Sequence, residues 1–357
     1  MKYFILIMSL VLLMEWNTYD ANAELGISSC MYIGDYDPNG FYCPNNPMDP
    51  FYLSKNCTSF IYDAQILFDD QSTDDLNIDY DYAINDLLDN NKSVYLFARY
   101  EKSKCPPEAE DNTDHGLANI QRLLKNYTIA GFILFNLNFN STINCDDKLK
   151  QYVNIVKQFN SIQIGLYVNA KSMIDHTNDA TATGWFDFEE LNNFMDYYII
   201  GFEMFNPCND QYKGGIIPLN NVQNSNYSLT TLANVLNKSK IAKDKIYLLF
   251  PVVPTVNDTS TEGLPECSVA YKKYCENDHY NKYWCADNAD SLYQKGKFAK
   301  DIHAKGIIVR NIDAIDPTAT CDCNNQDKFI SFTMMLRGYL GEDPIKDCAK
   351  LNSITDT

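Results

Sequence analysis

The chain alternates short runs of β-branched and aromatic residues with segments whose apolar residues repeat at helical spacing. The first kind of run predicts eight strands, which begin near Cys30, Thr58, Val94, Ile129, Ile162, Tyr197, Ile246 and Gly306. The intervening segments carry apolar residues at i, i+3 and i+4 spacing, as in Leu229, Leu232 and Leu236. Eight such strand and helix units are what a (β/α)8 barrel requires. The alternation therefore predicts an α/β fold with a single TIM barrel.

An open, doubly wound sheet is the other fold that this alternation can form. It is disfavoured because no Gly-rich phosphate loop follows any expected strand. The longest interval separates strands seven and eight and contains residues 254–284, with Cys267 and Cys275 inside and Cys285 just after. We therefore expect a short disulfide-stapled insertion between strands 7 and 8. The expected barrel spans residues 24–345, and residues 346–357 form a C-terminal tail.

The first residues have the features of a secretory leader. Lys2 precedes an apolar run that ends at Met14, and small residues at positions 21–23 suit signal peptidase. Residues 1–23 are therefore predicted to be a signal peptide. The apolar run is too short for a membrane span, and no later run reaches the roughly 20 apolar residues that a spanning helix needs. We expect a secreted, extracellular monomer.

Cysteine usage agrees with secretion. The sequence has 12 cysteines, all beyond the predicted cleavage point, and an even number permits complete pairing. A metal site is the alternative use of cysteine, but no pair has C-x-x-C spacing and the four histidines are scattered. The sequence thus predicts disulfides, with neither a metal ion nor a cofactor.

The charge balance excludes one class of partner. Asp and Glu number 47 against 29 Lys and Arg, which gives a net charge of −18 at pH 7. A surface of that charge repels the phosphate backbone of nucleic acids. A cationic protein is a better electrostatic match.

Seven Asn-x-Ser/Thr sequons are candidates for N-glycosylation, at Asn56, Asn91, Asn126, Asn140, Asn226, Asn237 and Asn257. We expect several of them, but not all, to carry glycans. Asn140 and Asn257 follow strands four and seven, so we expect them around the mouth of the barrel, where strands end. Asn91, Asn126 and Asn237 precede strands and are expected on the opposite face.

The fourth expected strand resembles a known family. Residues 127–138 read Tyr-Thr-Ile-Ala-Gly-Phe-Ile-Leu-Phe-Asn-Leu-Asn, which is similar to the signature Y-G-F-D-G-[LIVMF]-D-[LF]-D-W-E-Y of family 18 glycoside hydrolases, the chitinases. Other segments resemble further strands of that family in the same order, at residues 30–32, 57–62, 195–200, 218–219, 243–248, 284–292 and 305–309. The resemblance covers nearly the whole mature chain. It implies the chitinase barrel and a disulfide between Cys30 and Cys57.

The departures from the signature concern catalysis. In the family, a glutamate acts as the general acid, and preceding aspartates orient the substrate acetamide that attacks the anomeric carbon. The glutamate position is Leu137 here, and the aspartate positions are Ala130, Ile133 and Phe135. Leucine cannot donate a proton, and loss of a positioned general acid costs about 10²–10⁴-fold in rate. The resemblance therefore implies a chitinase-like protein without hydrolase activity.

The walls of the expected site also differ from the family pattern. The small residues that end strand three become Phe97-Ala98-Arg99-Tyr100, the Tyr and Asp of strand six become Glu203 and Met204, and the tryptophan beneath the innermost sugar becomes Arg310. The expected remodelled pocket thus contains Asp63, Arg99, Tyr100, Glu203 and Arg310. One interpretation is a new charged site in which Glu203 acts as acid or base. The other is a network of paired charges that fills the former sugar site.

These features predict a secreted pseudoenzyme that acts by binding. The ligand is either a glycan, of chitin type or from N-glycans, or an extracellular protein partner. The aromatic residues of 275–284 either form an outer glycan platform or cover the core of the insertion. Asp313 and Asp316 are expected to cap loops. The remaining alternative is a residual glycosidase that uses Glu203.

Overall fold

The structure is a computed structural model that describes residues 24–34, 48–67, 78–99, 115–135, 145–159, 162–178, 185–223, 225–256, 284–314 and 329–352, with Tyr271, Cys275, Cys321 and Cys323. Several predicted features lie outside the described residues, namely the signal peptide, Tyr100, Leu137, Asn140, Asn257, Cys267 and Asp316. The side chains of Asp63 and Arg99 also lie outside the described part, although β2 and β3 contain their backbones.

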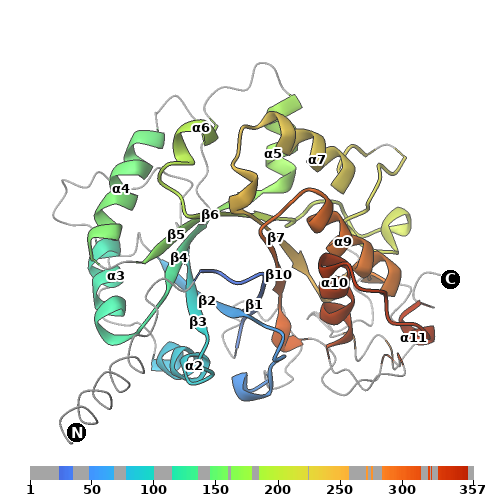
Figure 1. Cartoon of the computed structure of the whole chain (residues 1–357), viewed down its shortest axis with the longest axis horizontal. Helices are drawn as coiled ribbons and strands as arrows, with labels where there is room; N and C mark the ends of the chain where they lie inside the picture. The colour runs from blue at the N-terminus through green and yellow to red at the C-terminus, as the bar shows by residue number, and fades with distance from the viewer. Residues whose placement is uncertain are drawn as a thin grey trace, which may run out of the picture.

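Eight parallel strands close into a barrel (Figure 1). They are β1 (Ser28–Tyr32), β2 (Ser59–Leu67), β3 (Ser93–Arg99), β4 (Gly131–Phe135), β5 (Gln163–Asn169), β6 (Tyr197–Gly201), β7 (Ile246–Pro251) and β10 (Gly306–Arg310). Pairing between β10 and β1 closes the ring. Each strand begins within two residues of its expected start. The predicted (β/α)8 barrel is confirmed.

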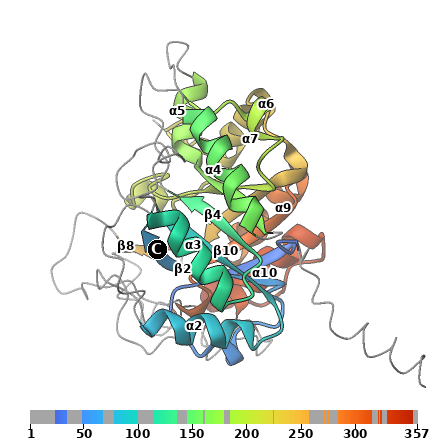
Figure 2. The same cartoon turned by 90° about the vertical axis from the view of Figure 1, so that its left-hand side faces the viewer.

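Helices surround the barrel, and Figures 1 and 2 show them packed along its outside. They are α2 (Ile78–Leu88), α3 (His115–Asn126), α4 (Cys145–Phe159), α5 (Ala170–Asn178), α6 (Phe188–Leu191), α7 (Leu229–Lys238), α9 (Ala289–Asp301), α10 (Ile330–Leu340) and α11 (Ala349–Asn352). Apolar spacing explains which helical face is buried. Leu229, Leu232 and Leu236 of α7, for example, are all buried against the outer core.

A second core fills the inside of the barrel. Tyr95, Tyr167, Tyr197 and Tyr247 contribute rings to it, beside aliphatic side chains such as Ile133 and Ile199. Glycines on neighbouring strands make room for these rings. A Cβ at Gly306 would lie 2.7 Å from the Tyr247 ring, and one at Gly131 would lie 3.0 Å from the Tyr95 ring. The interior is therefore packed with side chains, as in other barrels of this class.

The expected insertion between the seventh and eighth barrel strands is present. Its base is an antiparallel pair of short strands, β8 (Thr255–Val256) and β9 (Trp284–Cys285). Cys285 is bonded to Cys208 in the loop after β6, and Cys275 is bonded to Cys321 after β10. These disulfides tie the insertion to two neighbouring loops of the barrel.

The beginning of the predicted tail packs on the barrel. Cys348 forms a disulfide with Cys323, and Leu351 of α11 is fully buried. The contacts of α11 are made with α9. Residues 346–352 therefore add to the outer core.

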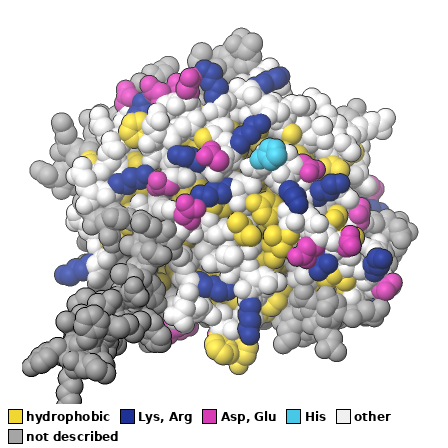
Figure 3. Space-filling model, in the orientation of Figure 1, with side chains coloured by type: hydrophobic (Ala, Val, Ile, Leu, Met, Phe, Trp, Pro, Cys, Tyr) yellow, Lys and Arg dark blue, Asp and Glu magenta, His cyan; other side chains and the backbone are white. Residues whose placement is uncertain are grey.

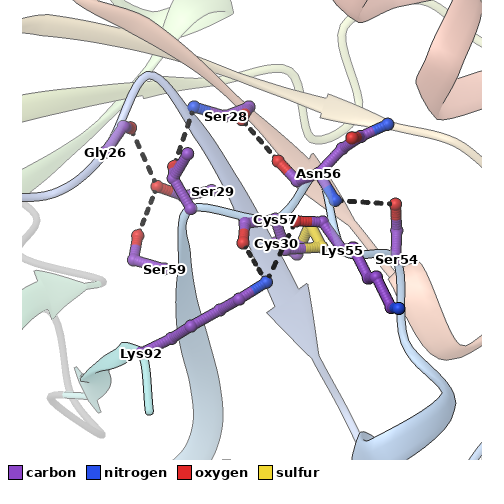
Figure 4. Close-up of a disulfide and its surroundings, with 11 residues drawn as sticks. Gly26, Ser28, Ser29, Cys30, Ser54, Lys55, Asn56, Cys57, Ser59 and Lys92 are labelled. Carbon is purple, nitrogen blue, oxygen red and sulfur yellow. Dashed lines mark hydrogen bonds between the residues drawn. A yellow bond between two sulfur atoms is a disulfide. The ribbon is translucent and has the colours of Figure 1, made fainter. Parts of the chain in front are cut away.

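A disulfide between Cys30 and Cys57 also joins β1 to the turn before β2, with a Cα–Cα distance of 5.5 Å (Figure 4). This is the pairing that the family resemblance implies. Lys92 reaches the same turn, where its ammonium group donates to the carbonyl oxygens of Lys55, at 3.2 Å, and of Cys57. The Ser28 hydroxyl donates to the Asn56 carbonyl at 2.7 Å. The turn before β2 is thus fixed by covalent and hydrogen bonds.

Five of the seven sequon asparagines lie in the described part of the chain. Asn56, Asn91, Asn126, Asn226 and Asn237 are all exposed. Asn91, Asn126 and Asn237 lie shortly before β3, β4 and β7, on the side of the barrel where strands begin, as expected.

Candidate functional site

The site expected from the sequence lies where the strands end and the loops to the helices begin. On β4, Ile133 is completely buried in the inner core, and the partly buried Phe135 and Ala130 pack against the same core. These are three of the four positions at which the family signature has a carboxylate. At all three the barrel interior receives an apolar side chain.

Three aromatic rings fill the interior at the upper end of β3, β4 and β5. The ring centroids of Phe135 and Tyr167 are 4.6 Å apart, and Phe97 lies 5.5 Å from Phe135 and 6.2 Å from Tyr167. All three pairs have edge-to-face geometry, which aromatic quadrupoles favour. We call Phe97, Phe135 and Tyr167 the aromatic plug, because together they pack in the barrel interior near the ends of β3, β4 and β5.

An ion pair lies at the mouth. Arg310, the last residue of β10, places Nη1 2.5 Å from Oε1 of Glu203, which follows β6 by two residues. Since β7 lies between β6 and β10, the pair crosses the end of that strand. The side chains are 27% and 33% exposed. Among the five predicted pocket residues, Glu203 and Arg310 are the two whose side chains meet in the described part of the structure. Such a pair is expected if paired charges fill the former sugar site.

Asn169 positions the backbone of Glu203. Its Nδ2 donates to the Glu203 carbonyl at 3.1 Å, while its Oδ1 accepts from the Ser172 amide at 3.0 Å. The second bond caps the start of α5, a common role for asparagine. Asn169 was not among the candidates derived from the sequence. An asparagine at a strand-to-helix junction was the signal that could have found it.

Tyr167 links the aromatic plug to the ion pair. Burial raises the pKa of its hydroxyl well above the ordinary value, and the nearby Glu203 charge raises that pKa further. The hydroxyl therefore stays protonated under physiological conditions and can act only as a neutral group. Tyr167 was also missed at the sequence level, where alternation along β5 would have placed it inside the barrel.

The backbone turns sharply after each member of the ion pair. Met204 follows Glu203 with φ 51°, and Asn311 follows Arg310 with φ 67°. Left-handed backbone is common for asparagine but unusual for methionine. The Met204 side chain is also 86% exposed. Such strain concentrates at functional sites.

Asp313 caps a loop, as expected from the sequence. Its carboxylate accepts from the amides of Gly34, at 2.9 Å, and Ile33, at 3.3 Å, just after β1. It thus ties the loop after β10 to the loop after β1.

Within the described residues, no group of three or more His, Cys, Asp or Glu side chains is arranged to hold a metal ion. None of the described helices is long and apolar enough to cross a membrane.

Comparison with known proteins gives no match to a family model or to a curated protein sequence. Solved structures do match. The group IV chitinase of Ostrinia furnacalis has a TM-score of 0.66 at 13% identity over 88% of this chain and 100% of that one. The chain has the fold of a chitinase.

Two other matches show that this fold occurs both in a pseudo-chitinase and in a chitinase. Human YKL-39, described as a pseudo-chitinase with retained chitooligosaccharide binding, has a TM-score of 0.62 at 16% identity, over 89% of this chain and 100% of that one. A family 18 chitinase from Cycas revoluta, in complex with allosamidin, has a TM-score of 0.62 at 9% identity, over 88% and 100% of the two chains. Because the fold serves both kinds of protein, the side chains at the mouth, and not the fold, decide the function.

Proposed function

We propose that the protein is a secreted, glycosylated pseudoenzyme with a chitinase fold, which binds a ligand at the mouth of the barrel without hydrolysing it. The observation that carries this proposal is the apolar inner face of β4. Ile133 is fully buried in the barrel and Phe135 packs in the aromatic plug. Neither side chain can orient an acetamide group or exchange a proton.

The ion pair supports the same conclusion. Substrate-assisted hydrolysis needs a general acid and a group that holds the substrate acetamide. Glu203 is a described carboxylate at the mouth, and its Oε1 is occupied by the Arg310 guanidinium at 2.5 Å. One of the two carboxylate oxygens of Glu203 is therefore already engaged by a cation. A residual glycosidase that uses Glu203 has correspondingly less support.

A glycan is the ligand class that we favour. The fold is shared with human YKL-39, a pseudo-chitinase with retained chitooligosaccharide binding. The aromatic plug packs in the barrel interior below the mouth, so such a glycan would lie across the mouth instead of entering it deeply. An extracellular protein is the second ligand class, and the net charge of −18 favours a cationic one.

Secretion is part of the proposal. Four described disulfides, which form in oxidising compartments, support it together with the predicted leader. N-glycosylation is expected at some of the exposed sequons.

The test combines a hydrolysis assay with a binding scan. We expect the purified protein to leave N-acetylated chitin oligomers uncleaved, and Glu203→Gln to behave like the wild type. We expect binding to a restricted set of sugars on a glycan array, and weaker binding to them by Arg310→Ala. Turnover that disappears in Glu203→Gln would establish the glycosidase alternative. An array without any bound sugar would favour the protein partner.

A further inference from the structure

Two aromatic side chains are largely exposed on the surface away from the barrel mouth. Phe51 is 77% exposed and Tyr52 is 66% exposed, and their ring centroids are 5.2 Å apart. Both belong to the 3-10 helix η1 (Pro50–Tyr52), which precedes β2 and therefore lies on the side where strands begin. In the space-filling view, hydrophobic side chains project at the lower edge, where Figure 1 places η1 (Figure 3).

The turn that carries these rings is rigid. Pro50 and Leu53 are buried on either side of them, so the turn is anchored in the core. The Asp49 carboxylate accepts from the Phe51 amide at 2.8 Å, and its carbonyl accepts from the Tyr52 amide at 2.9 Å. The exposure of the two rings is therefore fixed by the backbone and its anchors. Rigid, exposed aromatic side chains are typical of binding hot spots.

Carboxylates lie on the two elements that meet here, at the N-cap of η1 (Asp49) and at the end of the neighbouring helix. The helix α2 lies next to η1 (Figure 1), and Asp86 and Asp89 lie at its C-terminal end. Partial burial raises the pKa of Asp86, and the charges of Asp49 and Asp89 raise it further. Asp86 thus lies between two other carboxylates whose charges it senses.

The C-terminal end of α2 is acidic, whereas the helix dipole favours basic residues at that end. Most of the other barrel helices place a base in their last turn, namely Lys125 in α3, Lys157 in α4, Lys238 in α7, Lys300 in α9 and Arg337 in α10. The last turn of α2 has no base and contains Asp86, with Asp89 just beyond. Lys92 follows and keeps its positive charge, and its ammonium group is directed to the carbonyls of Lys55 and Cys57 in the turn before β2. The helix dipole and the carboxylates therefore add up to a field that attracts cations.

We propose that this aromatic–acidic face, formed by Phe51, Tyr52, Asp49, Asp86 and Asp89, docks an arginine-containing segment of a partner protein. A guanidinium can stack on an exposed ring and pair with carboxylates at the same time, which a lysine ammonium does less well. The two ring planes meet at 88°. They therefore offer separate faces and edges, unlike the continuous flat platform on which successive sugars stack. This surface is distinct from the proposed ligand site at the mouth.

The test uses labelled peptides and fluorescence anisotropy at low salt. The probe is a ten-residue peptide of alternating glycine and arginine, and its control has citrulline, which is neutral and has nearly the same shape, in place of arginine. We expect the arginine peptide to bind at least ten-fold more tightly than the citrulline peptide. Asp86→Asn/Asp89→Asn should weaken its binding about ten-fold.

Matched variants separate the proposed contacts from general effects. Asp244→Asn/Asp301→Asn removes two exposed carboxylates elsewhere and should change affinity less than two-fold. Phe51→Leu/Tyr52→Leu keeps apolar bulk but removes the rings, and should weaken binding nearly as much as Phe51→Ala/Tyr52→Ala. Thermal melting of each variant confirms that it is folded, as expected for exposed positions.

Three results would overturn the proposal. One is equal affinity for the arginine and citrulline peptides. Another is an equal loss in the Asp244/Asp301 control, which would show that only net charge matters. The third is a glucosamine oligomer that binds in a Phe51- and Tyr52-dependent way while the arginine peptide does not, which would make the ligand a cationic glycan. Since the face lies away from the mouth, none of these results bears on the proposed glycan site.

Discussion

Gly165 of β5 lies directly opposite Tyr197 of β6, and a Cβ on the glycine would overlap the tyrosine ring. Further along the same two strands the relationship is reversed, because a Cβ on Gly201 of β6 would overlap the hydroxyl end of Tyr167 of β5. Each strand thus omits a side chain where its neighbour places a ring. The space left by Gly201 therefore sets the position of Tyr167 in the aromatic plug beneath Glu203.

Gly165→Ala should therefore be strongly destabilising. The Cβ would meet the buried Tyr197 ring, which has no free space into which to move, and overpacking of a core costs about 1–3 kcal/mol or more. We expect a loss of about 3 kcal/mol in the free energy of unfolding, measured by urea denaturation. Tyr197→Leu in the same chain should restore part of the loss, with a coupling of about 1–3 kcal/mol. A loss below about 1 kcal/mol would show that the ring can move.

Alkaline pH should unfold the protein through its interior tyrosines. Burial is the main factor that raises the pKa of Tyr95, Tyr167 and Tyr197 above the usual value of about 10. The folded chain holds these protons more tightly than the unfolded chain, so stability falls as pH rises above about 10 and is unaffected by them at lower pH. Each tyrosine contributes about 1.4 kcal/mol per pH unit in that window.

Urea midpoints between pH 8 and 11.5, recorded with tyrosinate absorbance, would check this expectation. Tyr197→Phe removes one ionisable group and should make the decline less steep. Ionisation of every tyrosine in a chain that remains folded would contradict the assignment of these three to the sealed interior.

The Glu203–Arg310 ion pair should add little to stability. Its atoms are 2.5 Å apart, but both side chains are about one third exposed, and ion pairs in such settings contribute about 0–1 kcal/mol. A double-mutant cycle with Glu203→Gln and Arg310→Met should give a coupling below about 1 kcal/mol that shrinks in high salt. A coupling above about 3 kcal/mol would instead indicate a pair that solvent does not reach.

Loss of the disulfide between Cys30 and Cys57 should be costly. The bond closes a loop of sequence separation 27, and the chain-entropy model gives about 3–4 kcal/mol for a loop of that length. We expect Cys30→Ser/Cys57→Ser to lose about that much in thermal or urea unfolding. Asn56→Gln, an exposed change in the same turn, serves as the control and should cost under about 0.5 kcal/mol. Peptide mapping under non-reducing conditions must recover the two cysteines in one linked fragment.

The architecture could be predicted from the sequence because its signals are local. Eight β-rich runs and the helical spacing between them, as in Leu229, Leu232 and Leu236, depend only on residues close together in the chain. The order of these segments restricts the fold to a barrel or an open sheet, and the lack of a Gly-rich phosphate loop favours the barrel. The similarity to the chitinase signature assigned the β4 positions Ile133 and Phe135, which the structure places in the barrel interior.

The contacts at the candidate site depend on tertiary structure. Glu203 and Arg310 are 107 residues apart in sequence, and closure of the barrel with β7 between their strands brings them within 2.5 Å. Sheet register, which no single segment encodes, matches Gly165 to Tyr197. The aromatic–acidic face likewise combines η1 with the end of α2, whose proximity follows from helix packing on the barrel. Local sequence patterns thus account for the strands, the helices and the apolar composition of β4. The closed barrel sets which side chains meet, because those contacts join residues far apart in the chain.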